Sequence, residues 1–382
     1  MASKGDNMSS PTLPLEIQFL ILDRVRLDNG RIDRKELRRM AFVCLSWAGH
    51  IESLLFRGVD LGDTHALAQR YLSLFHRNNR LGRYTTRLSL QPDIAFDYPD
   101  LQTFLPNVCT VIVSGCIMGP LKESSRPWST VRRLCIRFCL LSTAGDLWRL
   151  IGLFPALERL EFSGWLMPET PETLIGGAID IPAIHLKHLV LESFRNNSPH
   201  SVALQLALHE LTVERVSITL EALDHDASPL NTLLSKIGPS VQHLELTELP
   251  ADMTPVVGIS IRPCTALRGL TLSLRFSTDS PQDMKAGLIT LLGQIRSPML
   301  AMLSLRVSLT VPLLELPWEE VDRILAGSLY PELRRVVVGV LVSDAPSKTE
   351  LCSSFDELAM TLNDKMVGLV QRRLLHFERG DL

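Results

Sequence analysis

Leu267-Arg268-Gly269-Leu270-Thr271-Leu272 is one copy of the pattern that decides the fold of this chain. Two apolar residues flank one variable residue, and another Leu or Val usually stands three residues before the first of them. Because successive side chains of a β-strand point to opposite faces, the pattern predicts a short strand with one buried face. Ten such pairs occur along the chain: Leu88/Leu90, Val111/Val113, Leu134/Ile136, Leu160/Phe162, Leu189/Leu191, Leu211/Val213, Leu244/Leu246, Leu270/Leu272, Leu303/Leu305 and Val336/Val338.

The spacing of these pairs is typical of a repeat protein. Their first members are separated by 23, 23, 26, 29, 22, 33, 26, 33 and 33 residues, at or somewhat above the leucine-rich-repeat period of about 20–29 residues. Helix-forming stretches at 146–151, 230–237, 283–295 and 318–325 lie between pairs. Since one unit alone cannot bury its apolar face, the pattern predicts an α/β repeat solenoid with parallel strands on its concave wall. An alternating α/β domain with a closed sheet is the structural alternative.

The two ends of the chain differ from this pattern. A disordered polar tail is expected at 1–12, a helical unit at 13–57 and the solenoid at 58–382. A short strand at 56–61 leads out of the helical unit. Near the C-terminus, Ser354 and Glu357 have the spacing of a capping box. The apolar periodicity that follows predicts a helix over 354–376, which would cover the last layer of the solenoid.

The N-terminal stretch predicts a compact set of helices. Pro14 suits the first position of a helix, where its missing N–H costs nothing. The helix that follows is apolar on more than one side, so other protein must cover it. Asp33 and Glu36 form a second capping-box pattern. Behind it, helical spacing is kept by Leu37, Met40, Ala41, Cys44, Trp47 and Ala48.

This stretch resembles an F-box in Leu13-Pro14, Glu16-Ile17, Ile21-Leu22, Val25, Leu37, Val43-Cys44 and Trp47. Phe56 stands where a second Trp is often found, and the turn between the first two helices is somewhat long. The long, irregular repeats are similar to those found behind F-boxes. The resemblance implies binding of a Skp-family adaptor and, through it, a cullin scaffold. The adaptor contacts that it implies are Leu13, Pro14, Ile17, Ile21, Leu22, Val25, Leu37, Val43, Cys44 and Trp47.

Composition narrows the class of protein. The 382 residues are 46% hydrophobic with a net charge of -3, so we expect a large folded interior and no general field for nucleic acid. Pro106 and Pro120 interrupt the uncharged stretch 101–121, so we expect no membrane span there. The seven cysteines include no Cys-x-x-Cys, which favours free thiols in an intracellular protein of the cytoplasm or nucleus.

The sequence contains no catalytic or metal-binding motif that we recognise. His209-Glu210 lacks a second histidine at metal-ligand spacing. His185 and His188 would point to opposite faces of a strand, which argues against a shared metal. We therefore expect neither an enzyme nor a cofactor.

The remaining candidate site is the concave face. Residues beside the apolar pairs point away from the core, and their charges are grouped, with arginines at both ends and glutamates between them. This grouping predicts a target with Lys or Arg at its centre and acidic or phosphorylated ends, because other arrangements would be repelled. The target-binding residues so predicted are Arg133, Arg137, Arg159, Glu161, Glu192, Glu210, Glu214, Glu245 and Arg306.

Together these observations favour a substrate-receptor subunit of an SCF-type (Skp–cullin–F-box) ubiquitin ligase, with an unknown protein target on the solenoid. The first alternative is a leucine-rich-repeat scaffold or interaction protein whose N-terminal helices only cap the solenoid, and the second is a catalytic α/β domain whose site we do not recognise. Burial distinguishes the ligase subunit from the scaffold, because a cap packs against the first strands, whereas a docking unit leaves an apolar face open.

Overall fold

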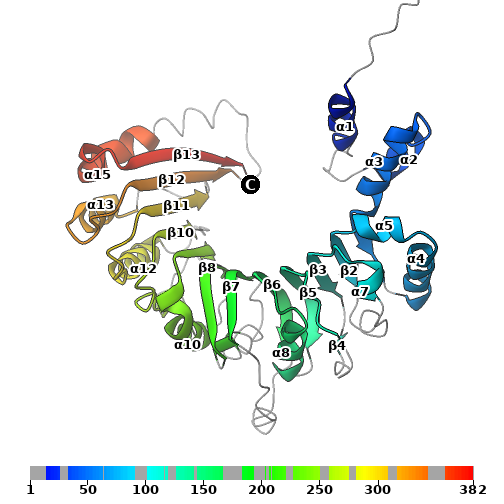
Figure 1. Cartoon of the computed structure of the whole chain (residues 1–382). Helices are drawn as coiled ribbons and strands as arrows, with labels where there is room; N and C mark the ends of the chain where they lie inside the picture. Colours follow the sequence, from blue (N-terminus) through cyan, green and yellow to red (C-terminus); the bar gives the residue numbers. More distant parts are fainter. Residues whose placement is uncertain are drawn as a thin grey trace, which may run out of the picture.

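The computed structural model is described for 14–25, 33–62, 64–90, 101–115, 117–118, 126–141, 144–166, 183–192, 203, 206–207, 209–220, 227–249, 258–274, 281–308, 316–342 and 358–381. These residues form an open arc with strands along its inner wall and helices on its outer side (Figure 1). The first helix and the C-terminus face each other across the mouth of the arc (Figure 1). Among the helices of the described ranges, none combines the length and apolar character needed to cross a membrane.

The strands form one sheet in the order β1-β2-β3-β5-β6-β7-β8-β9-β10-β11-β12-β13, and β4 pairs with β5 beside this path. Every pairing is parallel, as expected for a repeat solenoid. The strands are β1 (Gly58–Asp60), β2 (Arg87–Leu90), β3 (Thr110–Ser114), β4 (Ile117–Met118), β5 (Arg133–Leu141), β6 (Arg159–Leu166), β7 (Ile184–Leu191), β8 (Leu211–Thr219), β9 (His243–Leu249), β10 (Gly269–Leu274), β11 (Met302–Ser308), β12 (Arg335–Val342) and β13 (Leu375–Asp381).

Helices connect the strands on the convex side and extend the N-terminal end. The N-terminal helices are α1 (Leu15–Asp23), α2 (Arg34–Met40) and α3 (Leu45–Phe56). The others are α4 (His65–Arg77), α5 (Asn79–Tyr84), α7 (Leu101–Phe104), α8 (Ala144–Gly152), α10 (Ser228–Ile237), the 3-10 turn η2 (Gly238–Ser240), α12 (Pro281–Gly293), α13 (Trp318–Ala326) and α15 (Val367–Gln371). The four predicted helical stretches and the short strand near 58 are confirmed.

The apolar pairs build the core in register. Leu270 of β10 pairs with Leu244 of β9 on one side and Leu303 of β11 on the other, and all three are buried. Helix residues such as Leu233 and Leu288 belong to the same continuous core. The sheet stays open between its two end strands, which excludes the closed-sheet alternative.

The prediction for β8 is wrong in register. Val216 and Ile218, rather than Leu211 and Val213, align with Leu244 and Leu246 of β9. Leu211 and Val213 are buried further back along the strand, and Val213 is the apolar residue three positions before Val216. With Val216 as the first member, the separations from Leu189 and to Leu244 become 27 and 28 residues, which removes the irregular 22 and 33.

The prediction for the C-terminus is also corrected. The described helical residues run from 358 to 365, and α15 follows after Met366, whose φ and ψ of -108° and 49° interrupt the helix. Arg373 has a φ of 58°, and the chain then turns into β13. Leu375 and Phe377 pair with Val336 and Val338, so a strand ends the solenoid. Residues 1–12 and 354–357 lie outside the described residues.

Candidate functional site

The N-terminal helices have a core of their own. Leu22, Leu37 and Ile51, one from each of α1, α2 and α3, are fully buried together. This cluster is separate from the core of the solenoid. Asp33 caps α2 by accepting hydrogen bonds from two backbone N–H groups, as its capping-box position predicts. The described residues 14–25 and 33–56 therefore form a small helical unit with a core distinct from that of the repeats.

The unit is attached to the arc through α3. Helix α3 packs beside α5 and leads into β1 (Figure 1). The Arg80 guanidinium lies 2.8 Å from the Glu52 carboxylate, and Arg34 donates to the Gly58 carbonyl at 3.2 Å. Helix α3 thus joins α1 and α2 to the first repeat of the solenoid.

The residues that the F-box resemblance implies fall into two groups. Pro14, Ile17, Ile21, Val43 and Cys44 are exposed and available to a partner. Those that pack within the unit are Leu22 and Leu37, which are fully buried, and Val25 and Trp47, which are partly buried.

Leu22 and Leu37 cannot contact a partner in this structure, because each fills the small core. The Trp47 indole N–H donates to Gln18 Oε1 at 2.6 Å, so this side chain fastens α3 to α1. Leu13 lies outside the described residues. At least two of the residues that the resemblance implies as adaptor contacts are therefore buried inside the unit.

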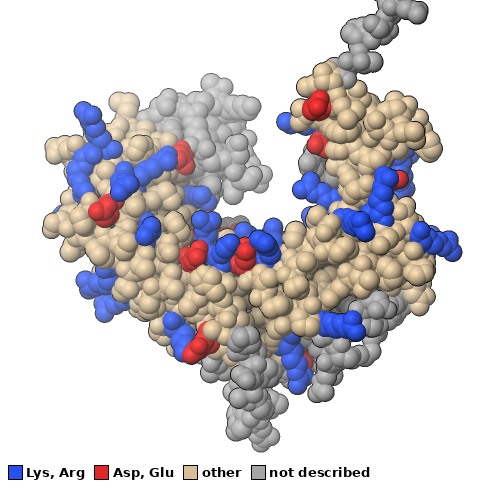
Figure 2. All heavy atoms as spheres, in the orientation of Figure 1, with Lys and Arg blue, Asp and Glu red and all other residues tan. Residues whose placement is uncertain are grey.

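Further exposed apolar residues lie between and beside the implied ones. Phe42 and Leu45, which flank Val43 and Cys44, are 90% and 93% exposed. Leu15 and Leu20 are exposed on α1. We call Leu15, Ile17, Leu20, Ile21, Phe42, Val43 and Leu45 the N-terminal apolar residues. The corresponding end of the arc presents mostly uncharged atoms (Figure 2).

The second candidate site lies on the concave wall. One row of side chains, each just before a buried pair, crosses five neighbouring strands in register. This row, from β5 to β9, is Arg133, Arg159, His188, Arg215 and His243. Basic and acidic groups meet on the floor of the arc (Figure 2).

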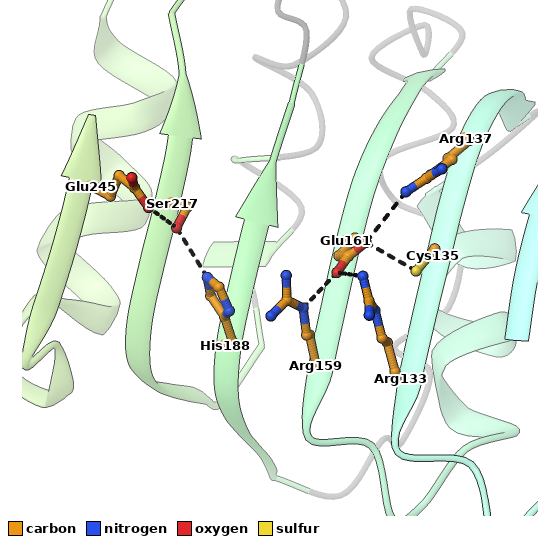
Figure 3. A network of polar contacts seen from close by, with 8 residues as sticks. All are labelled: Arg133, Cys135, Arg137, Arg159, Glu161, His188, Ser217 and Glu245. Atoms are coloured by element: carbon orange, nitrogen blue, oxygen red, sulfur yellow. Dashed lines mark hydrogen bonds and ion pairs between the residues drawn. The ribbon is translucent and has the colours of Figure 1, made fainter. Parts of the chain in front are cut away.

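Glu161 on β6 gathers three arginines around one carboxylate (Figure 3). Its Oε1 lies 2.6 Å from Arg133 Nη2 and 2.5 Å from Arg159 Nε, and its Oε2 lies 3.8 Å from Arg137 Nη2. The Glu161 side chain is only 6% exposed, whereas the arginine side chains are 39–45% exposed. We call these four residues the arginine cluster. Its carboxylate lies at the bottom and its guanidinium groups reach toward solvent.

Cys135 completes the surroundings of Glu161. Its thiol donates to Glu161 Oε2 at 3.0 Å. Burial, and the hydrogen bond and negative charge of Glu161, raise the pKa of the Cys135 thiol to about 11, so it stays protonated and serves as a donor. Burial alone would raise the pKa of Glu161, but the hydrogen bonds from Cys135 and Arg159 and the charges of Arg133 and Arg159 outweigh it and lower this pKa. Glu161 is therefore ionised at neutral pH.

A second chain of contacts lies next to the cluster (Figure 3). The Ser217 hydroxyl donates to Glu245 Oε2 at 3.0 Å, so His188 Nε2, 3.0 Å from the same hydroxyl, must supply the proton of their contact. Arg306 holds the other oxygen of Glu245 at 3.3 Å. Burial, followed by the charges of Arg159 and Arg215, lowers the pKa of His188 to about 4. His188 is therefore a neutral donor at pH 7.

The predicted acidic centre of the concave face is not formed. Glu210 precedes β8, and Glu214 on β8 lies beside His185 of the neighbouring strand β7, 3.3 Å from its Nε2. Glu161 is buried among arginines, and Glu245 is engaged by Ser217 and Arg306. Glu192 is exposed directly after the end of β7.

The centre therefore presents guanidinium groups rather than free carboxylates. Arg215 was missed in the sequence because the register of β8 was displaced. The apolar pattern at Val213, Val216 and Ile218 could have placed Arg215 beside His188.

Possible metal ligands do not gather in the described part of the chain, where no group of three or more His, Cys, Asp or Glu could hold an ion. His185 contacts Thr212 at 2.7 Å as well as Glu214, whereas His188 contacts Ser217. The two histidines thus have separate partners.

Comparison with known proteins finds a structural likeness but no matching family model or curated protein. No protein-family model matches the sequence, and no curated protein matches it. Among solved structures, the chain is similar to a leucine-rich-repeat protein of Leptospira interrogans, at 15% identity and a TM-score of 0.27. That match covers 78% of this chain and 74% of the other. A likeness of this size assigns no function; the parallel strand order of this chain is the evidence for its repeat fold.

Proposed function

We propose that this chain is the substrate-receptor subunit of an SCF-type ubiquitin ligase, with the N-terminal helical unit docking a Skp-family adaptor and the arc holding a target protein. The observation that carries this proposal is the set of exposed N-terminal apolar residues on a unit with its own core. Large apolar side chains gathered on one small unit are typical of a surface that another protein covers.

The exposure of these residues favours docking over capping. A helical cap would turn its apolar side chains toward the first strands of the solenoid. Instead, Leu22, Leu37 and Ile51 suffice to close the small core, and Phe42 and Leu45 are almost fully exposed. These two residues lie in and next to the turn between α2 and α3, where they add nothing to the packing of the unit.

In this proposal the chain contributes geometry rather than chemistry. The attachment of α3 to α5 would fix the adaptor at one end of the arc. A target on the concave wall would then be held at a set distance from the ubiquitin-transferring subunits. Holding two reactants together raises their effective concentration, which is the means by which such a receptor accelerates transfer.

A leucine-rich-repeat scaffold without a ligase role is the second candidate. Two observations favour it: α3 packs on the first repeat as a cap does, and no F-box family model matches the sequence. In that case the N-terminal apolar residues would bind a partner other than the adaptor.

The test is a pull-down of the tagged full-length chain, probed for the adaptor and the cullin. The wild-type chain should recover both, and the Phe42→Asp/Val43→Asp double variant should recover neither. Leu329→Asp is the matched control, because Leu329 is an equally apolar residue, 67% exposed, at the far end of the arc. Recovery of neither subunit by the wild-type chain would overturn the ligase proposal. Unchanged recovery by the double variant would exclude docking through these residues.

A further inference from the structure

The junction between the N-terminal helical unit and the arc is a single crossing of the chain (Figure 1). Helix α3 ends at Phe56, and β1 begins two residues later at Gly58. The two cores do not merge, but Phe56 packs against the core of the solenoid, with its ring centroid 6.3 Å from that of Phe75. This contact lies at the crossing itself, so it fixes where the unit is attached and has little effect on the direction in which the unit points.

Two arginines, one from each side of the crossing, make further contacts between the unit and the arc. Arg80 of α5, on the arc, places its Nη2 2.8 Å from the Glu52 carboxylate of α3. Arg34 of α2, on the unit, donates to the Gly58 carbonyl at 3.2 Å. The contacts attach α2 and α3 at separate places, and together they oppose rotation of the unit about the crossing.

Arg80 is itself oriented by the arc before it meets the unit. Its Nε donates to the Tyr84 hydroxyl at 2.9 Å, one turn further along α5, and its guanidinium carbon lies 5.8 Å from the centre of the Tyr84 ring. On the other side, a Cβ added to Gly49 would lie 3.5 Å from Arg80 Nη2, so the guanidinium rests against α3 between Gly49 and Glu52. A side chain that is already oriented loses less rotamer freedom when it forms an ion pair.

We propose that Arg34 and Arg80 are positioning residues, which hold the N-terminal helical unit at one angle to the arc across a junction that is otherwise a hinge. Hinges are short segments that absorb a change of backbone direction, as the crossing between α3 and β1 can. The side chains of Arg80 and Glu52 are 60% and 39% exposed, so their contact can open without unfolding either core. The consequence of this inference rests on the proposed function, in which the angle sets the distance between a target and the ubiquitin-transferring subunits.

The test measures the distance between the unit and the arc by double electron–electron resonance on the full chain. Two native cysteines serve as label sites, because Cys44 on the unit and Cys109, directly before β3 on the arc, are both exposed. The other described cysteines are buried. Cys116 and Cys352, which lie outside the described residues, are replaced by serine. The chain with its arginines intact should give one narrow distance distribution.

Variants connect this distribution to the two arginines. Arg34→Gln/Arg80→Gln should raise the share of molecules outside the main distance peak about fivefold, as the loss of two exposed charged contacts would give. Arg38→Gln/Arg83→Gln is the matched control, because it makes the same changes at exposed arginines of α2 and α5. Arg80→Glu should broaden the distribution further, and Glu52→Arg/Arg80→Glu should narrow it again by restoring an ion pair with the charges exchanged.

The charge exchange separates positioning from a general loss of stability, because a destabilised fold would not be repaired by it. Thermal unfolding of every variant should match that of the unchanged chain. A broad distribution in the chain with its arginines intact would overturn the inference, and so would equal distributions in Arg34→Gln/Arg80→Gln and its control. Failure of the charge exchange to narrow the distribution of Arg80→Glu would also overturn it.

The inference and the ligase proposal fail separately. The labels report on the chain without any partner, so the distances are informative whether or not the adaptor binds. The adaptor pull-down should be unchanged in Arg34→Gln/Arg80→Gln, because this variant keeps all the N-terminal apolar residues.

Discussion

Replacing Glu161 by Gln tests the electrostatic account of the concave wall most simply. Glutamine keeps the shape of the side chain and one accepting oxygen, but it removes the charge. Its NH₂ group would face the donors that now surround one carboxylate oxygen, the Cys135 thiol and Arg137. The three arginines would then lie together without a counter-charge.

The expected loss of stability follows from how deeply Glu161 and its arginine partners are buried. Removing one partner of a fully buried ion pair costs about 3–5 kcal/mol, and exposed pairs contribute about 0–1 kcal/mol. Glu161 is buried, but its arginine partners are 39–45% exposed and partly screened by water. We therefore expect Glu161→Gln to lower the free energy of unfolding by about 2 kcal/mol.

The contribution of Glu161 to stability should decrease as the pH falls. The folded structure lowers the pKa of Glu161 below its usual value of 4.5. A carboxylate with a lowered folded pKa stabilises the protein above its unfolded pKa and loses that contribution as the pH falls. The difference between wild type and variant should be full above about pH 5.5 and shrink below pH 4.5.

Urea denaturation at several pH values, followed by tryptophan fluorescence and circular dichroism, measures both effects. Glu332→Gln is the control, since Glu332 and its partner Arg334 are exposed and should change stability by less than about 0.5 kcal/mol. A loss at Glu161 as small as at Glu332, or one that does not shrink at low pH, would refute the reasoning.

The remaining predictions concern packing, helix capping and protonation. Leu303→Ala should cost about 2–5 kcal/mol by emptying a buried strand position, whereas Thr271→Ala on the concave side should stay within about 0.5 kcal/mol in the same urea assay. Asp322 accepts from the Gly368 and Leu369 N–H groups at 2.9 and 2.8 Å, so Asp322→Ala should cost about 1–2 kcal/mol and increase amide exchange in α15. The pKa of His188 is lowered from 6.5 to about 4, so the unfolded chain binds the extra proton and stability should fall as the pH drops from 6.5 to 4. Because the ring is partly exposed, we expect this loss of stability to be about 1 kcal/mol and to be absent in His188→Gln. The His188 ring should titrate near pH 4 when it is followed by NMR.

The repeat fold follows from the sequence because the spacing of buried side chains in a strand is fixed. Leu270 and Leu272 can both face the core only in an extended chain. The same rule failed at β8, where Leu211 and Val213 also alternate and are also buried, so periodicity alone could not select the register. It failed again at Leu375, which was assigned to a helix although Leu375 and Phe377 fit the strand pattern.

The sites were less predictable, because burial depends on contacts between distant segments. The first helix is apolar on several sides, so its sequence could not show that Leu22 faces inward and Ile21 outward. Glu161 was placed on the concave face, but its burial depends on Cys135 and Arg133 of the neighbouring strand. A charge map of single positions therefore gave the wrong sign for the centre of the face.

Hydrogen exchange of the full-length chain, with and without the purified Skp-family adaptor, tests the central claim most directly. Docking through the N-terminal apolar residues should slow exchange in α1 and in residues 41–45, and should leave β5 to β9 unchanged. Exchange that is the same with and without adaptor, or protection confined to the strands of the arc, would contradict the assignment of the N-terminal helices as the docking unit.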